Sequence, residues 1–436
     1  MASAEPLPDE LAVLLDGRIA GRLRRGTERT SNVFTYESSW RDDPLAFPLS
    51  LSLPLAGRTY EGSRIDYYLR GLLPDNETRL NAIAHEFGVS PDNPFTLLAH
   101  VGEDCPGAVQ FARPERVRDL TAQGPTKVQW LTEAQIAKIL RELRDDSVDG
   151  ASVALTGQFS LPGALSKVAL VRNEKTKRWG HPSGRAASTH IVKPPLGGVK
   201  YHNENEHLCL ELARRCGFSA AKSFLLRAED MQALAVERYD RSRRGKSVHR
   251  LHQEDMSQAL GINPRLKYSA EGAPAISDIV LLLREHSSRG VDDVYDFVKA
   301  VSFNWLIAAT DAHPRNYSIL ISQGAGVTVA PLYDLASALV LPTRERTEEL
   351  PFAMTVGGRK RLGSITRSAW EGEARKLRLD AKRLVNEIGE LAHDVAASVS
   401  EVAELSVDNG VDERFANRFA SRVSGRAKAC ARELTP

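Results

Sequence analysis

The sequence predicts an α+β protein with a β-rich N-terminal subdomain, a two-lobed core and an all-helical C-terminal region. Short apolar runs separated by glycine and proline turns occupy the N-terminal part. Strand-like and helix-like stretches alternate in the middle, and the tail from Trp370 is charged with helical periodicity. A length of 436 residues suits two or three domains. The predicted segments are an N-terminal subdomain (1–115), a linker with a connecting helix (116–146), a first lobe (147–240) and a helical second lobe (241–436).

In the N-terminal part, "LAVLLDGRIAGRL" predicts a β-hairpin whose turn is Asp16-Gly17. The stretch "IDYYLRGLLPDNETRLNAIAHEFGVS" has a helical pattern that breaks around residues 74–76. Residues 111–127 are polar and contain prolines, so we expect a linker there. Thr132 is the expected N-cap of the helix that follows.

In the core, strand-like segments precede the helix "NENEHLCLELARRCGF", which Asn203 or Asn205 is expected to cap and Gly217 to end. The apolar strand in "QALAVERYDR" runs into a basic loop, and we expect the crossing between the lobes at 241–250. From "VYDFVKAVSFNWLIAA" onward the pattern is helical again.

Composition excludes several classes of protein. Apolar residues make up 42% of the chain and the formal net charge is +2, so the whole chain gives no sign of a polyanion partner. The four cysteines lack CxxC spacing, which argues against a zinc knuckle. The N-terminal "MASAEPLPDE" does not resemble a signal peptide, and no run reaches the roughly 18 apolar residues of a membrane span. We therefore expect a soluble protein of a reducing compartment, with no membrane partner.

The loop in "LIAATDAHPRNYSILI" places Asp311 and Asn316 five residues apart after an apolar helix. Phosphoryl transfer needs a carboxylate that orients the attacking hydroxyl and accepts its proton, and hard oxygen ligands for Mg²⁺. The protein-kinase catalytic loop has the same Asp-to-Asn interval. Arg315 is placed to balance charge on the phosphoryl group or to face solvent. The loop also fits a capped helix end, or a metal site on Asp311 and His313.

Four further stretches fit this chemistry, and each has a structural alternative. "VAPLYDLASAL" brings Asp334 to a strand end, as a Mg²⁺ ligand or a helix N-cap. Lys193 ends the strand in "THIVKPP", where it contacts nucleotide phosphates or faces solvent. The glycine turn of "FSLPGALSK" cradles phosphate or closes a hairpin. "AVERYDR" offers hinge backbone to an adenine ring or simply leaves a sheet.

The order of these parts is more informative than any one of them. The parts follow the order found in a protein kinase, which is a glycine turn, a strand lysine, a helix, a hinge strand, a catalytic loop and a strand-borne aspartate. Glu206, on the helix, is a candidate partner of Lys193 by the same analogy. We therefore expect a protein-kinase-like core with ATP in the cleft between two lobes.

The chain resembles the HipA family, the serine/threonine-kinase toxins of bacterial HipBA toxin–antitoxin modules. The matching stretches are "FSLPGALSKVAL", "STHIVKPP", "NENEHLCLELARRCG", "AVERYDR", "RLHQEDMSQALG", "FNWLIAATDAHPRN" and "PLYDLASAL". "AVLLDGRIAGRL", "LLPDN" and "VGEDCPGAVQF" also resemble the N-terminal subdomain of the family. The resemblance covers most of the chain, and "ATDAHPRN" and "LHQEDM" make it specific.

The resemblance implies an ATP- and Mg²⁺-dependent serine/threonine protein kinase in which Asp311 is the catalytic base and Asn316 and Asp334 are the Mg²⁺ ligands. It implies that Ser160 is autophosphorylated, which expels the nucleotide turn and silences the kinase. Leu165 stands where the family has Gln, a departure expected to loosen that turn or shift its in–out balance. The implied ATP contacts are Pro162, Gly163, Ala164, Leu165, Ser166, Lys167, Lys193, Glu237, Arg238, Tyr239, His313, Arg315, Asn316, Tyr333 and Asp334.

The resemblance also implies partners and a location. These are a HipB-like helix-turn-helix antitoxin, operator DNA bound through the antitoxin complex, a protein substrate in translation, and the bacterial cytoplasm. In the best-studied type of the family the target is glutamyl-tRNA synthetase. A basic C-terminal cluster suits direct contacts to DNA phosphates or an ordinary charged helix face. Its members are Arg359, Lys360, Arg361, Arg367, Arg375, Lys376, Arg378, Lys382 and Arg383.

Two other functions stay open from the residues. A catalytically weak kinase-fold binding module, acting as co-repressor with the antitoxin on operator DNA, would share the fold. The retained catalytic and ligand residues argue against it. A metallohydrolase built on Asp311 and His313 would need further ligands, for which His252 and Asp255 are the candidates.

Overall fold

The computed structural model describes residues 7–27, 31–122, 126–145, 160–163, 165–245, 247–268, 271–342 and 345–435. The chain divides into two compact units. Unit 1 comprises Met1–Gly197, Leu226–Arg265 and Leu320–Gly326, and unit 2 comprises Gly198–Leu225, Leu266–Ile319 and Val327–Pro436.

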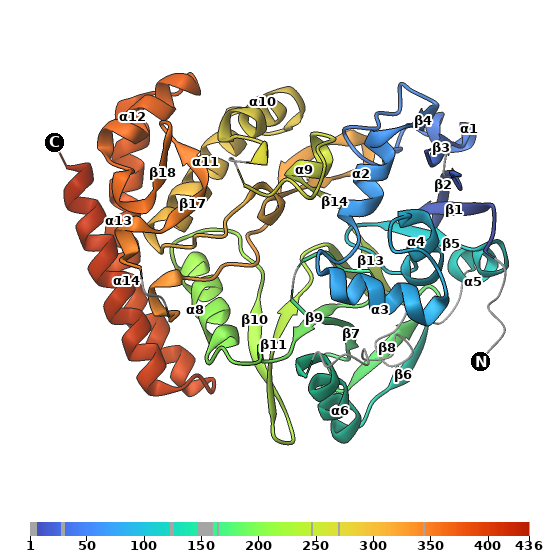
Figure 1. The fold of residues 1–436 in the computed structure, drawn as a ribbon, viewed down its shortest axis with the longest axis horizontal. Coiled ribbons are helices and arrows are strands. Elements are labelled where there is room, and N and C mark those ends of the chain that lie inside the picture. Colours follow the sequence, from blue (N-terminus) through green and yellow to red (C-terminus); the bar gives the residue numbers. More distant parts are fainter. Residues whose placement is uncertain are drawn as a thin grey trace. The chain divides into compact units, whose positions relative to one another are not determined.

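The first sheet of unit 1 has five antiparallel strands in the order β4-β3-β2-β1-β5 (Figure 1). They are β1 (Glu10–Leu15), β2 (Arg18–Arg24), β3 (Val33–Tyr36), β4 (Thr59–Glu61) and β5 (Val109–Ala112). The predicted hairpin is confirmed, because Asp16 and Gly17 join β1 to β2 with φ of 46° and 77°. Two positive φ angles match the twist of the flanking strands. The helices of this part are α1 (Ser38–Arg41), α2 (Ser63–Gly71), α3 (Glu77–Phe87), α4 (Pro94–Val101) and α5 (Val117–Thr121).

The second sheet has six strands in the order β10-β11-β9-β7-β8-β6. They are β6 (Lys127–Trp130), β7 (Val168–Arg172), β8 (Trp179–Ser183), β9 (His190–Lys193), β10 (Ser223–Ala228) and β11 (Met231–Glu237). The predicted linker is not a free connection, because β6 pairs with β8 at the sheet edge. Helix α6 (Glu133–Arg144) follows, and Thr132 caps it as predicted, in a capping box with Gln135.

The expected lobe crossing at 241–250 is wrong. Strands β12 (Arg241–Arg244) and β13 (Ser247–Arg250) form a hairpin within unit 1, and β14 (His252–Asp255) and α9 (Met256–Ala259) follow. The chain leaves unit 1 between Arg265 and Leu266. A run of basic residues suggests a solvated connection, but half of this hairpin's arginines are buried in ion pairs described with the site.

Unit 2 is mainly helical. Its helices are α8 (His202–Arg215), α10 (Ile276–His286), α11 (Val291–Leu306), α12 (Arg367–Lys376), α13 (Ala381–Asp408) and α14 (Glu413–Leu434). Tyr201, with φ of 63°, occupies the N-cap position of α8 instead of Asn203 or Asn205. The Asn205 amide is used elsewhere, because it donates to the Ser337 carbonyl at 2.9 Å and accepts from the Ser337 N–H at 3.1 Å. Helix α8 is thereby tied to a segment that is distant in the sequence.

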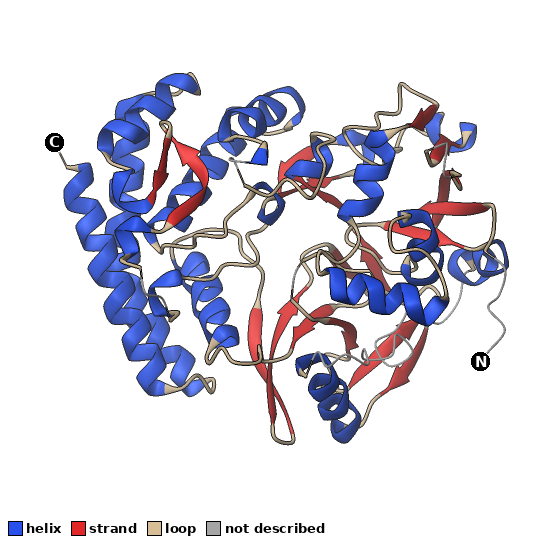
Figure 2. Cartoon of the chain, viewed as in Figure 1, coloured by secondary structure: helices blue, strands red, loops and turns tan. Residues whose placement is uncertain are grey.

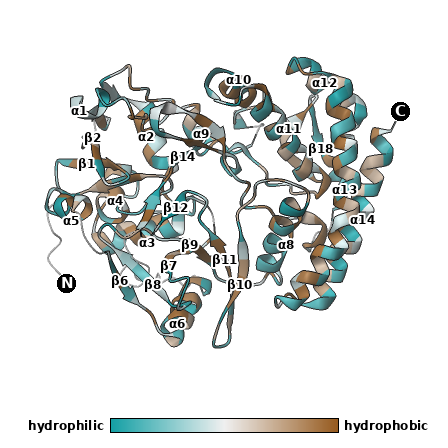
Figure 3. Ribbon diagram, turned by 180° about the vertical axis from the view of Figure 1, so that it is seen from behind, coloured by the Kyte–Doolittle hydropathy of each residue, from teal (hydrophilic) through white to brown (hydrophobic). Residues whose placement is uncertain are grey.

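The predicted all-helical C-terminal region is confirmed from α12 onward, whereas strands occur in the part of 241–436 that precedes it. Figure 2 shows β17 (Pro351–Val356) and β18 (Arg359–Arg361) as a hairpin among the helices of unit 2. From α12 onward the segment is helical, and α13 and α14 pack against each other. Apolar residues recur along both helices, which appear in Figure 3 as brown segments alternating with teal ones. In the part of the chain that the structure describes, no helix is both long and apolar enough to cross a bilayer.

Glu254 on β14 provides a stability prediction. Its side chain is fully buried and Oε1 accepts from the Leu51 N–H at 2.8 Å. Burial raises the pKa of Glu254 to about 8. Between the unfolded value near 4.5 and this value the folded chain keeps a proton that the unfolded chain has lost, so the free energy of unfolding falls as pH rises. The whole contribution is on the order of 5 kcal/mol.

Glu254→Gln keeps the acceptor oxygen and removes the titration. We expect urea unfolding at pH 6 and pH 9 to show a smaller loss of stability in this variant than in the parent chain. Parallel pH dependence in the two proteins would show that Glu254 is not protonated in the folded state.

Candidate active site

The loop that carries Asp311 follows α11 and is held by its own hydrogen bonds. The main-chain carbonyl of Asp311 accepts from the His313 N–H at 2.8 Å and from Nδ2 of Asn316 at 2.9 Å. A short 3₁₀ helix, η3 (Pro314–Asn316), closes the loop. The Asp311 side chain is exposed. Because the amide nitrogen of Asn316 donates within the loop, its side-chain oxygen is the atom that can ligate a cation.

Tyr268 contacts the Asp311 carboxylate, a contact that no sequence motif indicates. The phenol donates to Oδ1 of Asp311 at 2.8 Å. Burial, followed by the hydrogen bond to Asp311, raises the pKa of Tyr268 to about 12, so the phenol stays protonated at neutral pH. The Asp311 carboxylate therefore accepts a hydrogen bond from a hydroxyl group, as a catalytic base does from its acceptor.

His313 lies beside this pair. Its imidazole is 6% exposed, and the ring of Tyr268 meets it edge-on with 6.1 Å between centroids. Burial lowers the pKa of His313, although the carboxylate of Asp311 acts in the opposite direction. The imidazole is therefore neutral at pH 7. Arg315 is also 6% exposed, so the alternative of a solvated arginine is wrong.

Tyr333 joins the catalytic loop to the segment of Asp334. Its hydroxyl donates to the Arg315 carbonyl at 2.9 Å and lies 2.6 Å from Oγ of Ser318. Asp334 is exposed and has φ of 55°, a strained conformation for a residue with a side chain. The helix N-cap alternative for Asp334 is wrong, because the next helical turn is η5 (Ala338–Val340) and its N-cap is Ser337. The two predicted Mg²⁺ ligands thus lie on segments that Tyr333 connects.

The donor chemistry here fits a hard divalent cation. Asp334 supplies a carboxylate and Asn316 a carbonyl oxygen, which are the ligand types of Mg²⁺. A zinc or iron site fits less well. Among the described residues, no group of three or more His, Cys, Asp or Glu side chains is arranged to hold a metal. His252 is occupied, because Nε2 lies 2.9 Å from the Leu49 carbonyl and Nδ1 accepts from the Ala108 N–H at 3.3 Å.

The residues expected to contact ATP phosphates lie in unit 1. Lys193 ends β9, opposite Leu234 of β11, and is 7% exposed, so the solvated alternative is wrong. In the turn, Gly163 has φ of 110° and its carbonyl accepts from the Asp75 N–H at 3.2 Å. Nζ of Lys167 donates to the Pro162 carbonyl at 2.5 Å. Leu165 and Ser166 are half-buried, and Ala164 lies outside the described residues.

Ser160 is buried, with 1% of its surface exposed. Its hydroxyl donates to the Leu72 carbonyl at 2.7 Å, and its N–H donates to the Asp104 carbonyl at 3.2 Å. Both acceptors belong to the N-terminal part of unit 1. The start of the turn is therefore held by the N-terminal subdomain.

The expected hinge follows β11. Glu237 is exposed, and the Tyr239 hydroxyl donates to Gln253 at 2.6 Å. The Arg238 side chain is 2% exposed and engaged in ion pairs, so it does not face a nucleotide. If Arg238 contacts adenine, it does so through its main-chain N–H and carbonyl groups. Arg238 belongs to a cluster of five charged residues that no sequence pattern predicted. Its members are Asp104, Arg238, Asp240, Arg241 and Arg250.

Comparison with known proteins gives two family matches. Residues 11–112 match the model described as HipA N-terminal domain, and residues 159–399 match the model described as HipA-like C-terminal domain. The second match covers more than half of the chain. Among curated relatives, the Sinorhizobium fredii protein Y4mE is 36% identical over 428 residues, which are 96% of this chain and 97% of that protein.

Two further matches, one from the curated proteins and one from the solved structures, come from Shewanella oneidensis. A protein named serine/threonine-protein kinase toxin HipA is 29% identical over 332 residues, which are 71% of this chain and 71% of that protein. A chain in the solved complex of HipA, HipB and operator DNA matches with a TM-score of 0.81 at 24% identity, covering 97% of this chain and 98% of that one. This likeness confirms the predicted α+β fold with a kinase-like core.

Proposed function

Because this chain belongs to the HipA family, as its sequence motifs predicted, we propose that it is an ATP- and Mg²⁺-dependent serine/threonine protein kinase and the toxin of a toxin–antitoxin pair. The observation that carries the proposal is the hydrogen bond that the Asp311 carboxylate accepts from a hydroxyl group at 2.8 Å. An acceptor serine or threonine would displace the Tyr268 phenol and take its place.

In the proposed reaction Asp311 orients the acceptor hydroxyl and takes its proton. The bond from the acceptor oxygen to the γ-phosphorus forms while the bond from that phosphorus to the bridging oxygen breaks, and ADP leaves. Asn316 and Asp334 would hold Mg²⁺, which neutralises charge on the phosphate oxygens when bound. Because burial lowers the pKa of His313, its imidazole carries no positive charge and forms no ion pair that would neutralise the Asp311 carboxylate.

The nucleotide side of the proposal rests on unit 1. Lys193 is buried at a strand end, where a cation gains most from a phosphate partner because little water competes. The turn at 162–167 would cover the phosphates, and the positive φ of Gly163 lets its backbone approach them closely. The main chain from Glu237 to Tyr239 would hold the adenine.

We further propose autophosphorylation on Ser160 as the way this kinase is silenced. A phosphoryl group does not fit on a hydroxyl that is 1% exposed and bonded to Leu72, so the modified turn must leave its place. Ser160→Ala is therefore expected to remove self-inactivation and to keep transfer to other proteins, at a cost of about 1 kcal/mol for the lost hydrogen bond.

The measurement is labelled-phosphate transfer from Mg-ATP, followed over time, with phosphopeptide mapping by mass spectrometry. Label on the Ser160 peptide of the parent chain, and a steady rate in Ser160→Ala, are expected. Ser183→Ala, which changes an exposed serine of unit 1, is the matched control. Undiminished self-inactivation of Ser160→Ala would refute this regulation. Absence of Mg²⁺-dependent label on any protein would refute the kinase itself.

The proposed partner is a HipB-like antitoxin on operator DNA, and the proposed target is a translation component such as glutamyl-tRNA synthetase. Part of the basic C-terminal cluster is already neutralised. Arg367 pairs with Glu371 at 2.8 Å, Arg383 pairs with Glu387 at 2.8 Å, and Arg361 pairs with Glu349. Direct DNA contacts are therefore best sought at exposed Arg359 and Lys360, whose removal should reduce the salt dependence of operator binding.

A further inference from the structure

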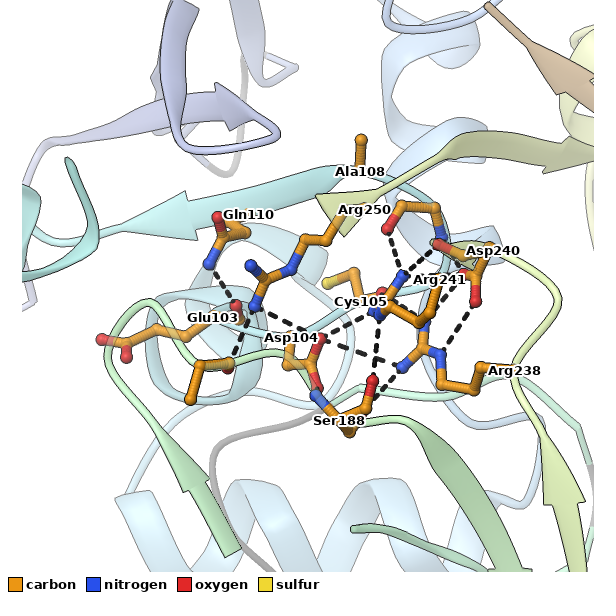
Figure 4. Close-up of polar contacts among 12 residues, drawn as sticks. Glu103, Asp104, Cys105, Ala108, Gln110, Ser188, Arg238, Asp240, Arg241 and Arg250 are labelled. Carbon is orange, nitrogen blue, oxygen red and sulfur yellow. Dashed lines mark hydrogen bonds and ion pairs between the residues drawn. The ribbon is translucent and has the colours of Figure 1, made fainter. Parts of the chain in front are cut away.

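Five charged side chains meet in the interior of unit 1 (Figure 4). Asp104, Asp240, Arg238, Arg241 and Arg250 have side chains that are at most 8% exposed. Three guanidinium groups face two carboxylates, so the cluster carries one excess positive charge. Burying charges costs several kcal/mol per ion unless each is paired and hydrogen-bonded. A cluster of this kind therefore fixes the positions of its members closely.

Asp104 is the member that the N-terminal subdomain contributes. Its Oδ1 accepts from Nη2 of Arg241 at 2.8 Å, and its Oδ2 accepts from the Ser188 N–H at 3.1 Å. Arg250 and Arg238 lie 3.6 and 3.8 Å from the same carboxylate. Burial alone would raise the pKa of Asp104, but the three guanidinium groups outweigh it and hold that pKa below its usual range. The carboxylate is therefore ionised in the folded chain.

Through its ion pairs with Arg241 and Arg238, the carboxylate of Asp104 is linked to the segment that follows β11. Arg241, its direct partner, also donates to the main-chain carbonyls of Ser188 and Gly107 at 3.1 and 2.9 Å. Arg238 donates to Oγ of Ser188 at 2.9 Å and forms a two-point pair with Asp240. Together with the pairing of β11 with β9, these contacts restrain the main chain at 237–239, which is the expected adenine hinge.

The main chain of Asp104 forms a hydrogen bond with the start of the nucleotide turn. Its carbonyl accepts from the Ser160 N–H at 3.2 Å, at the start of the segment 160–167. One residue thus contacts both parts of unit 1 that the proposed function assigns to ATP. These two parts are 70 or more positions apart in the sequence, so the intervening chain alone does not fix their separation.

We propose that Asp104 is a positioning residue for nucleotide binding, which holds the start of the nucleotide turn, at Ser160, and the hinge at 237–239 at one fixed separation. The inference rests on the proposed function. According to this inference, the N-terminal subdomain contributes to the nucleotide site. The match to the HipA N-terminal domain ends at residue 112, whereas the match to the HipA-like C-terminal domain starts at residue 159.

The test is Asp104→Asn, read by titration of the full chain with a fluorescent ATP analogue and Mg²⁺. The variant keeps Oδ1 as the acceptor for Arg241 and removes the negative charge. It also replaces Oδ2 by an amide NH₂ group, which cannot accept the hydrogen bond of the Ser188 N–H. We expect the dissociation constant to rise about tenfold, equivalent to about 1.4 kcal/mol. Glu103→Gln is the matched control, because Glu103 lies on the same loop and pairs with Arg116 at 2.8 Å outside the cluster. Its affinity should equal that of the parent chain.

A double variant separates positioning from stability. Asp104→Asn combined with Arg241→Met leaves two guanidinium groups facing one carboxylate, so the excess charge returns to that of the parent chain. We expect its melting temperature to recover while its nucleotide affinity stays low, and this holds even if the single variant fails to fold. Recovery of both, or unchanged affinity in Asp104→Asn, would overturn the positioning role. A parent chain that binds no Mg-ATP would overturn the proposed function, and the inference with it.

Discussion

Replacing Asp311 by asparagine is expected to reduce phosphoryl transfer by about 10²–10⁴-fold, the contribution of a general base. Asparagine has nearly the same shape and keeps an oxygen that accepts the hydrogen bond of Tyr268, so the loop geometry should survive. It cannot take the acceptor proton at neutral pH. The affinity for Mg-ATP should therefore stay within about twofold of the parent value, because the expected ligands of nucleotide and cation are other residues.

Labelled-phosphate transfer gives the rate, and titration with a fluorescent ATP analogue gives the affinity. Asp296→Asn is the matched control, since the Asp296 side chain is about half-exposed in the same unit and pairs with Arg289 at 2.9 Å. It should leave both quantities unchanged. Transfer by Asp311→Asn within tenfold of the parent rate would exclude Asp311 as the base. A loss of nucleotide affinity equal to the loss of rate would make Asp311 a binding residue instead.

The parts of the fold that could be predicted are those with local signals. The Asp16-Gly17 turn and the Thr132 cap are confirmed because a few adjacent residues determine the backbone there. The loop from Asp311 to Asn316 is held by a hydrogen bond between its own residues. The spacing of these two residues in the sequence was therefore a local signal as well. Sequence motifs also identified the family, which the comparisons confirm.

The parts that could not be predicted depend on contacts between distant residues. Tyr268 meets Asp311 across 43 positions, and a single tyrosine in a polar loop carries no periodic signal. Asp104 meets Arg241 across 137 positions. Charged residues ordinarily indicate solvent, which is why the segment at 241–250 was expected to be a basic loop between lobes. Pairing with Asp104 and Asp240 makes its burial possible, and the sequence does not show which partners a charge will find.

Replacing Asp240 by asparagine is expected to lower the free energy of unfolding by about 3–5 kcal/mol, the cost of breaking a buried ion pair from one side. The Asp240 carboxylate accepts from Nε and Nη2 of Arg238 at 3.0 and 2.8 Å, and from the Gly107 N–H at 2.6 Å. Its loss leaves the Arg238 guanidinium, which is 2% exposed, without its two-point partner. Urea unfolding at pH 7 measures the difference.

The pH dependence of this effect distinguishes a lost charge from a general packing defect. Burial opposes ionisation of Asp240, but Arg238 and Arg241 outweigh it and hold its pKa well below the usual range. A carboxylate of this kind stabilises the fold above its unfolded pKa near 3.8, and that contribution is lost as pH falls through the lower folded value. The difference between Asp240→Asn and the parent chain should thus be full at pH 7 and shrink below about pH 4. Asp230→Asn is the control, because Asp230 pairs with Arg141 at the surface of the same unit, and this variant should lose much less stability than Asp240→Asn. Equal losses in the two variants would show that the buried cluster is no stronger than a surface ion pair, and a deficit that does not change with pH would indicate a general packing defect instead of a lost charge.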